Sequence, residues 1–506
     1  MRPVLTPEAM GRADQRTIAA GTPVTVLMER AGRAVAWEAR RTLRGGYGHR
    51  AVIVCGKGNN GGDGLVAATA LERWGVRVHV VELASGVDRR QLARALGRAD
   101  VAIDAMYGTG FRGALEDDAA WFADELGAWG GPVIAIDIPS GVDGLTGAVQ
   151  GTAVQASSTV TFAARKPGLV FEPGKSHAGR IQVVDIDIDL GPDGGEPPPI
   201  ACYDADDVGR LLPPRPPTAH KWMAGVMVVG GSGGMTGAPM FVSHAAMRAG
   251  AGIVRCGLPG DAAAARASGS EVITLALPAT KEGALAPLAA EAVLADVSRF
   301  RAFALGPGLG SDPAVRQAVF ALVAEARVPL VLDADGLNAL NGDLEPLRTR
   351  QTLGAPTILT PHDGEYARLA GQPVGDDRIA AAQRLADRST AVVLLKGPGT
   401  VIAEPAIGGR PGRVALNDTG GTALATAGSG DVLTGVIAGF LARGVPAFEA
   451  AVCGAWVHGR AAERVAESMG DTGVVASDVV AAVAPTLHDL ALHDLSLHDL
   501  AREQGP

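Results

Sequence analysis

The fold of this chain is indicated first by residues 51–65, AVIVCGKGNNGGDGL. The run Ala51–Cys55 predicts a buried strand, the glycine-rich segment Gly56–Gly64 predicts a loop, and Leu65–Trp74 has a helical pattern. A strand that turns through glycines into a helix is the setting in which backbone amides and a helix N-terminus hold phosphate groups. This stretch therefore predicts an α/β unit with a nucleotide-like ligand.

The same alternation continues on both sides of this stretch. Residues 8–43 are predicted to be helical, and strands are predicted at 76–83, 101–105, 133–138, 160–164 and 181–188. Beyond residue 200 further strands are predicted at 226–229, 253–256, 272–277, 303–305, 330–332, 357–359 and 392–395. Short apolar runs separated by helical patterns indicate a mostly parallel sheet with helices on both faces, and the chain contains two such series.

The boundary between the two series lies at a segment rich in proline and glycine. Residues 191–199 read GPDGGEPPP, which can continue neither a strand nor a helix. We therefore predict a first domain at 1–195, a linker at 191–200, a second domain at 201–485 and a low-complexity tail at 486–506. The tail repeats Leu-His-Asp-Leu every five residues, a step of about 140° on a helix, so its histidines do not share one face. We expect a frayed extension without a function of its own.

Composition limits the classes of function. The chain has 506 residues, 47% of them hydrophobic and 20% charged, as expected of folded domains. Its net charge of −9 argues against nucleic acid as a partner. Its four cysteines are scattered without metal-ligand spacing, which indicates a reducing compartment. Because no apolar run reaches the length of a membrane span and Met1–Asp14 lacks the core of a secretion signal, we expect a cytoplasmic protein without a membrane partner.

Polar residues follow three predicted strands of the first domain. Asn60, Asp104 and Asp137 each come at or just after a strand end, and Ser140 follows closely. Strand ends of a parallel sheet meet at one edge, where ligands usually bind. Asn60, Asp104 and Ser140 offer oxygen ligands, which suit a hard cation better than zinc, although Asp104 alone could simply cap a helix or turn. The loop does not match G-x-G-x-x-G followed by an acid, so an ordinary dehydrogenase is disfavoured.

The second domain contains the more specific motif, Gly428–Asp431. Small residues expose amides at a helix start, and Asp431 is placed to activate an attacking hydroxyl, as phosphoryl transfer requires; an N-cap aspartate is the alternative. His362 follows another strand, where ligand contact competes with a structural role. Further clusters at predicted strand ends are Gly230–Pro239, Gly306–Gly310, Asp333–Asn338 and Pro361–Glu365.

Taken together, the motifs of residues 1–190 resemble the NAD(P)H-hydrate epimerase domain. The resemblance implies a Rossmann-like fold that interconverts the R and S forms of the hydrated cofactors NADHX and NADPHX. It also implies potassium ligands at Asn60, Asp104 and Ser140, and acid–base work by Asp137. Tyr107 stands where phenylalanine is more usual. The hydrate-binding positions that the resemblance implies are Asn59, Asn60, Gly61, Gly62, Asp63, Gly108, Thr109, Gly110, Phe111, Arg112, Gly113, Ala114 and Asp137.

Residues 201–485 resemble the ribokinase-like NAD(P)H-hydrate dehydratases in the order of their motifs. The resemblance implies that the hydroxyl of the S-hydrate is phosphorylated with ADP and that phosphate then leaves, giving NAD(P)H, AMP and phosphate. Mg²⁺ is expected with the nucleotide, and Asp431 would be the base. The implied hydrate contacts are Ala238, Gly308, His362 and Asp431, and the implied ADP or AMP contacts are Lys396, Gly397, Pro398, Gly399, Thr400 and Gly430.

Two other interpretations remain at this point. The first is a ribokinase-like small-molecule kinase with a non-catalytic, nucleotide-binding N-terminal domain. It explains the motif Gly428–Asp431 but leaves residues 1–190 unexplained. A first domain that only binds a partner as a scaffold needs no set like Asn60, Asp104, Asp137 and Ser140. The choice between ADP and ATP, the preference between NADHX and NADPHX, and assembly into a homo-oligomer are left open by the sequence.

Overall fold

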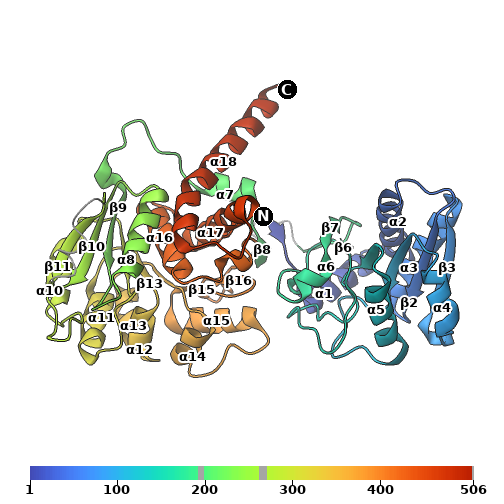
Figure 1. Cartoon of the computed structure of the whole chain (residues 1–506), viewed down its shortest axis with the longest axis horizontal. Helices are drawn as coiled ribbons and strands as arrows, with labels where there is room; N and C mark the ends of the chain where they lie inside the picture. Colours follow the sequence, from blue (N-terminus) through green and yellow to red (C-terminus); the bar gives the residue numbers. More distant parts are fainter. Residues whose placement is uncertain (192–198, 261–269, 504–506) are drawn as a thin grey trace. The chain divides into compact units, whose positions relative to one another are not determined.

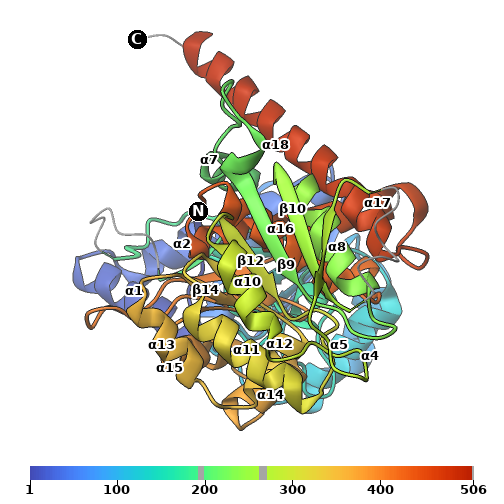
Figure 2. The same ribbon diagram turned by 90° about the vertical axis from the view of Figure 1, so that its left-hand side faces the viewer.

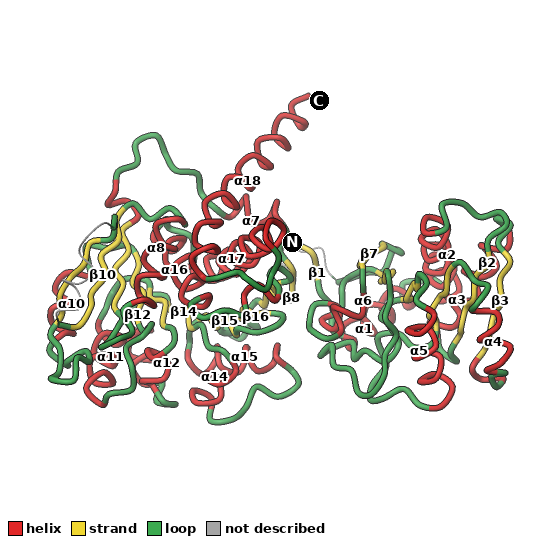
Figure 3. The backbone as a smooth tube through the Cα atoms, viewed as in Figure 1, coloured by secondary structure: helices red, strands yellow, loops and turns green. Residues whose placement is uncertain are grey.

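The computed structural model describes residues 1–191, 199–260 and 270–503, and the chain divides into two compact units (Figure 1). The first unit spans Arg2–Ile200, and the second comprises residues 201–506 together with Met1. Most of the predicted linker, residues 192–198, lies outside the described residues. Helices and strands alternate along both units (Figure 3).

The first unit is built on a six-stranded sheet in the order β3-β2-β4-β5-β6-β7, whose neighbouring strands all pair in parallel. Its strands are β2 (Arg50–Cys55), β3 (Arg77–Glu82), β4 (Val101–Ala105), β5 (Val133–Ile136), β6 (Ser158–Phe162) and β7 (Arg180–Val184), and β1 (Arg2–Pro3) precedes them. Its helices are α1 (Pro7–Ala19), α2 (Val24–Thr42), α3 (Asn59–Arg73), α4 (Arg89–Leu96), α5 (Asp117–Trp129) and α6 (Gly174–Ala178), with short 3₁₀ turns at Leu83–Ser85 and Pro167–Leu169.

The strand β2 shows why both faces of this sheet are covered. Successive side chains of a strand point to opposite faces. Ile53 and Cys55 join the apolar cluster of α2 and α3, whereas Val52 and Val54 join the cluster of α4 and α5. The predicted parallel sheet with helices on both faces is confirmed, while the helix predicted over 8–43 is two helices, which are separated at Gly21–Pro23.

The strand order of the first unit reverses between β2 and β4. The loops that follow these two strands run to opposite sides, which opens a crevice at the carboxyl edge of the sheet. Gly56 in the first loop lies so close to the second that an added Cβ would be 1.9 Å from the carbonyl oxygen of Met106. Glycine is therefore required for the two loops to meet.

The second unit has a larger sheet in which β8-β17-β16-β15-β14-β13-β12-β9-β10-β11 are successive neighbours. Pairing is parallel from β11 to β15 and antiparallel from β15 to β17. The strands are β8 (Ile200–Cys202), β9 (Gly225–Val229), β10 (Ile253–Pro259), β11 (Ile273–Leu277), β12 (Ala302–Leu305), β13 (Leu330–Leu332), β14 (Thr357–Leu359), β15 (Val392–Leu395), β16 (Thr400–Ala403) and β17 (Val414–Asn417).

Two layers of helices cover this sheet (Figure 2). The helices α8 (Gly237–Arg248), α16 (Ser429–Ala442), α17 (Ala447–Met469) and α18 (Ala476–Glu503) contribute to one apolar cluster with alternate residues of the strands. The remaining helices are α7 (Ala205–Leu211), α10 (Ala289–Val297), α11 (Pro313–Glu325), α12 (Asp335–Leu340), α13 (Glu345–Thr352), α14 (Asp363–Ala370) and α15 (Arg378–Ser389), and Lys221–Ala224 and Thr422–Leu424 are 3₁₀ turns. The strand order reverses between β9 and β12, the kind of position at which ligands usually bind in such sheets.

The helix α18 continues through residues 485 and 486, where we predicted the tail to begin. Leu490 of the first Leu-His-Asp-Leu repeat is buried in the core of the second unit, and the neighbouring Asp489 forms an ion pair with Arg464. The first repeat is thus a packed part of α18. Its Leu490 continues the apolar face of the helix, which the five-residue period of the repeat made difficult to recognise in the sequence. Within the described part of the chain, no helix is both long enough and apolar enough to cross a bilayer.

Candidate active sites

The first unit contains a pocket of about 810 Å³ at the reversal of its strand order. Loops after β2 and β4 form its floor, and α1 and α2 form part of its wall. Of the predicted positions, those on its lining are Asn59, Asn60, Asp63, Gly108, Thr109, Gly110, Phe111 and Asp137. The predicted positions outside the lining are Gly61, Gly62, Asp104, Arg112, Gly113, Ala114 and Ser140. The carboxyl edge of the sheet thus gathers residues that are distant in sequence.

Asp137 is the most strongly held carboxylate of this pocket. Its Oδ1 accepts hydrogen bonds from Lys166 Nζ at 2.6 Å and from Thr161 Oγ1 at 3.0 Å, and its Oδ2 accepts one from the Thr109 amide at 3.1 Å. Its backbone has φ +66°, an uncommon value for a residue with a side chain. Three contacts therefore fix this carboxylate in one orientation against an unfavourable backbone: two side-chain donors and one amide, and the contact with Lys166 is also an ion pair.

Lys166 was not predicted from the sequence. It lies four residues beyond the end of β6, is 1% exposed, and also donates to Thr161 Oγ1 and to the Phe162 carbonyl. A buried ammonium group needs a charged partner, and Asp137 provides it. The rule that located Asp137, a polar residue just after a strand, would have located Lys166 if it had been applied to the next strand of the sheet.

Asp104 and Ser140 form a separate, buried group next to the pocket. Asp104 is fully buried and accepts hydrogen bonds from Ser140 Oγ at 2.6 Å, from the Ser140 amide at 2.8 Å and from the Met106 amide at 3.2 Å. Burial raises its pKa to about 6, although the hydrogen bonds act in the opposite direction. Asn60 is buried too, and a Cβ at Gly108 would lie 3.2 Å from its Oδ1 and 3.4 Å from Oδ2 of Asp137.

The second unit places its glycine motif at the start of α16. Gly428 has φ +88° and is the N-cap residue, so Asp431 is the third residue of the helix and not its cap. Burial raises the pKa of Asp431 to about 7, and the nearby Asp333 carboxylate acts in the same direction. A carboxyl group with such a pKa can accept a proton near neutral pH, as a general base must.

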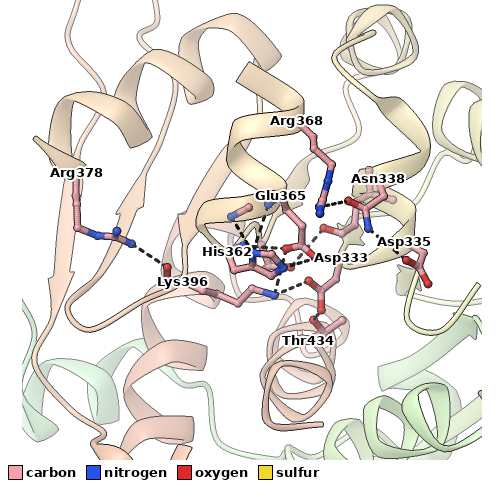
Figure 4. A network of polar contacts seen from close by, with 12 residues as sticks. Asp333, Asp335, Asn338, His362, Glu365, Arg368, Arg378, Lys396 and Thr434 are labelled. Atoms are coloured by element: carbon pink, nitrogen blue, oxygen red, sulfur yellow. Dashed lines mark hydrogen bonds and ion pairs between the residues drawn. The ribbon is translucent and has the colours of Figure 1, made fainter. Parts of the chain in front are cut away.

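A network of polar contacts lies at the strand ends (Figure 4), and its members Asp333 and Lys396 interact electrostatically with Asp431. Lys396 Nζ donates to Asp333 Oδ1 at 2.8 Å, and Thr434 Oγ1 of α16 donates to Asp333 Oδ2 at 2.6 Å. Glu365 is buried, with Oε2 3.7 Å from Lys396 Nζ. Burial alone would raise the pKa of Asp333, but Lys396 and the hydrogen bonds hold it below its usual value. Lys396 and Asp333 are therefore a charged pair whose ammonium faces the glycine motif.

The other predicted contacts of this unit lie at the same edge. A Cβ at Gly430 would lie 3.5 Å from Lys396 Nζ, and one at Gly308 would lie 3.4 Å from the Ala238 Cβ. His362 is the N-cap of α14, and its Nδ1 accepts hydrogen bonds from the amides of Gly364 and Glu365. Its imidazole is 54% exposed, so the ring combines a capping role with an accessible edge. Asp333 and Glu365 belong to motifs that were recognised in the sequence. The sequence alone did not show that both side chains lie close to Lys396.

The next feature is the arrangement of the side chains that most often bind metal ions. No group of three or more His, Cys, Asp or Glu with metal-binding geometry occurs among residues 1–191, 199–260 and 270–503. All four cysteines are free and buried. A transition-metal centre built from such groups is therefore absent from this part of the chain, whereas a site of mixed oxygen ligands is not addressed by this observation.

Comparison with known proteins agrees with this architecture. The family described as NAD(P)H-hydrate dehydratase matches residues 226–484, and the family described as YjeF-related protein N-terminus matches residues 24–97 and 84–168. The bifunctional NAD(P)H-hydrate repair enzyme of Moorella thermoacetica is 39% identical over 493 residues, covering 90% of this chain and 91% of that protein. The enzyme of that name from Escherichia coli is 32% identical, covering 91% and 88%.

Among solved structures, the ADP/ATP-dependent NAD(P)H-hydrate dehydratase of Bacillus subtilis, co-crystallised with ATP and Mg²⁺, is 29% identical to this chain. It covers 57% of this chain and 98% of its own length, with a TM-score of 0.48.

The topology and the family matches define a two-unit α/β protein, with a Rossmann-like N-terminal domain and a ribokinase-like C-terminal domain, as predicted. Relatives share more than 30% identity over most of both lengths. The chain belongs to the family of bifunctional NAD(P)H-hydrate repair enzymes.

Proposed function

We propose that this chain repairs hydrated nicotinamide cofactors with two separate sites. The pocket of the first unit interconverts the R and S forms of NADHX and NADPHX, with Asp137 as an acid–base group. The site at the start of α16 dehydrates the S form with ADP, and Asp431 is the base that deprotonates the hydroxyl before phosphoryl transfer. Phosphate is a far better leaving group than hydroxide, so its departure completes the dehydration and restores the reduced cofactor.

One observation carries the second half of this proposal. Asp431 lies in the first turn of α16, beside amides exposed by glycine and opposite the Lys396 ammonium, which faces Gly430. Phosphoryl transfer depends mainly on positioning and on stabilising negative charge, and this arrangement offers both together with a base. The proposed nucleotide contacts are Lys396, Gly397, Pro398, Gly399, Thr400 and Gly430, and the proposed hydrate contacts are Ala238, Gly308, His362 and Asp431.

For the first unit we propose a potassium ion held by Asn60, Asp104 and Ser140. Asp104 is fully buried and has no cationic partner among the described residues. A single carboxylate with amide and hydroxyl oxygens fits a monovalent cation, because divalent cations usually take more carboxylate ligands. The ion would supply the positive charge that Asp104 lacks and would fix the loops after β2 and β4. Mg²⁺ would accompany the phosphates of ADP, and we assign no protein ligand to it.

Four buried free thiols support a reducing compartment, so we propose the cytoplasm as the site of action. The expected small-molecule partners are the two hydrates and ADP.

The test is the recovery of reduced nicotinamide absorbance from a mixture of R- and S-NADHX. With ADP the full-length protein should convert all of the hydrate back to NADH, because the first unit supplies the S form as the second consumes it. Asp431→Ala should abolish recovery but leave the interconversion of the epimers intact, as measured by chromatography. Asp137→Ala should recover only the S form, and recovery should then continue at the slow spontaneous rate.

Three results would count against this proposal. A stable phosphorylated product without reduced cofactor would favour the small-molecule kinase. Loss of both activities in a correctly folded Asp431→Ala protein would contradict two separate sites. Full recovery at the normal rate by Asp137→Ala would exclude its proposed role. Repeating the assay with ATP in place of ADP decides the phosphoryl donor.

A further inference from the structure

A second carboxyl group on the pocket of the first unit, that of Asp63, is not explained by packing. Asp63 lies on α3, is 8% exposed and lines the pocket. Unlike Asp137, it has no hydrogen-bond or ion-pair partner within the described part of the chain. Buried polar groups are nearly always hydrogen-bonded, and leaving one without a partner costs free energy. A buried carboxyl that faces a cavity without a partner indicates a contact with the ligand of that cavity.

The charged groups around Asp63 come from several elements. Asp14 of α1, Asp137 after β5 and Lys166 after β6 line the same pocket, together with the exposed Lys57 and the acidic residues 116–118 at its rim. Helix α2 contributes the apolar residues Leu27, Met28 and Ala31 to the wall. Carboxylates thus outnumber the two lysines, and the ammonium of Lys166 is already bound to Asp137.

These surroundings favour the neutral, protonated form of Asp63. Burial raises its pKa to about 8, and the charges of Asp137 and Asp14 act in the same direction. Asp63 is the fifth residue of α3, beyond the first turn in which a helix end stabilises an anion. At neutral pH Asp63 is therefore a carboxylic acid in the same pocket as the ion-paired carboxylate of Asp137.

Inversion at the hydrated carbon needs both kinds of group. That carbon carries the hydroxyl and is bonded to the ring nitrogen. If the carbon–oxygen bond breaks, its electron pair leaves with the oxygen, which takes a proton and departs as water, while the nitrogen lone pair forms a carbon–nitrogen double bond. The resulting planar cation then accepts water on its other face, and that water gives a proton to a base. One acid and one base are sufficient.

We propose that Asp63 is the acid that protonates the departing hydroxyl, and that Asp137, paired with Lys166, is the base for the incoming water. This role rests on the proposed epimerase activity of the pocket. Each turnover leaves a carboxylate at Asp63 and a carboxylic acid at Asp137, and exchange of protons with solvent restores the starting state. The positive charge formed in between lies among carboxylates of the pocket wall, which stabilise it.

The experiment measures epimer interconversion by the full-length protein without ADP, so that the second unit consumes nothing. R- and S-NADHX are separated by chromatography, and the spontaneous rate is subtracted. Asp63→Asn should lower kcat on the order of 100-fold or more with a small change in KM, as expected for loss of a general acid. Asp63→Glu should restore part of kcat. Glu72→Gln, which changes an exposed carboxyl on the same helix, is the matched control and should retain the normal rate.

The pH profile separates a catalytic role from a structural one. Because Asp63 must be protonated, the normal rate should fall as the pH rises through about 8. Asp63→Asn should lack this fall. Dehydration of the S form with ADP should be unchanged in the same variant, which shows that the chain is folded.

The possible failures are distinguishable. If the unmodified protein does not interconvert the epimers, the proposed function of the first unit is wrong. If it does, but Asp63→Asn keeps a normal kcat or the same fall at high pH, the acid is another group. A rise in KM with an unchanged kcat would make Asp63 a binding residue only and would equally overturn the proposal.

Discussion

Asp137 and Asp431 are the two carboxyl groups to which we assign the role of a base, and their surroundings differ. Asp137 is bound by Lys166, by Thr161 and by a backbone amide, which hold it in place. Asp431 has no hydrogen-bond partner among the described residues, and its pKa is raised to about 7. The first carboxyl group is thus fixed by direct contacts, whereas the second is prepared by burial and by neighbouring charge to take a proton near neutral pH.

This difference predicts how the dehydratase responds to pH. Asp431 must be ionised to act as a base, so the rate should rise as the pH increases through about 7. Asp333→Asn removes a negative charge that raises the pKa of Asp431, so the rise should move to lower pH. The measurement is kcat/KM for S-NADHX with saturating ADP across the pH range. Asp376→Asn, at an exposed carboxyl without a partner in the described chain, is the control and should keep the normal profile. A shift to higher pH, or none, would contradict the proposed influence of Asp333.

At the scale of secondary structure, the sequence was sufficient for the buried parallel strands. The bounds predicted for β4, β13, β14 and β15 are those observed, because continuous apolar runs are typical of strands buried on both faces. The antiparallel strands β16 (Thr400–Ala403) and β17 (Val414–Asn417) were missed. The first has three successive β-branched residues but begins at Thr400, inside the motif that was interpreted as a nucleotide-binding loop. The second, Val-Ala-Leu-Asn, has a single β-branched residue.

Among functional residues, those in glycine-rich or strand-end motifs could be predicted, and those that act through tertiary contacts could not. Asp137 and Asp431 follow from local sequence. Asp14 lines the first pocket from a helix that carries no motif. Lys166 follows a strand, as Asp137 does, but its contact with Asp137 depends on β5 and β6 being neighbours in the sheet. The sequence shows which side chains stand at strand ends, but the pairing of those ends depends on strand order, which only the fold supplies.

The contact between α8 and α16 gives a prediction for helix packing. Gly435 of α16 lies so close to α8 that an added Cβ would be 2.2 Å from the Val242 carbonyl oxygen. Gly435→Ala should gain up to about 1 kcal/mol of helix propensity but lose about 1–3 kcal/mol to overpacking, and it should lower the melting temperature of the second unit. Gly127→Ala in α5 meets nothing within 4 Å and should instead stabilise the first unit slightly. Calorimetry of the two variants measures whether each substitution raises or lowers the melting temperature of its unit. A higher melting temperature for Gly435→Ala would show that the helices separate without cost.

At the scale of the whole molecule, each unit has its own sheet and its own apolar core. The clusters of the first unit and the large cluster of the second share no residue. Units with separate cores are expected to unfold as separate cooperative transitions, which a single melting temperature would not describe. Each proposed ligand should then stabilise only the unit that binds it, because a ligand stabilises the folded form to which it binds.

Calorimetry of the full-length protein should therefore resolve two transitions, and ADP should raise only that of the second unit. At 100 times its Kd, ADP adds about 2.7 kcal/mol to the stability of its own unit. For a unit of this size that corresponds to a rise in Tm of about 4 °C. Inorganic phosphate at the same ionic strength is the control for salt effects and should produce a smaller shift. If ADP raised both transitions equally, or if one transition contained both units, the chain would unfold as a single cooperative structure despite its separate cores.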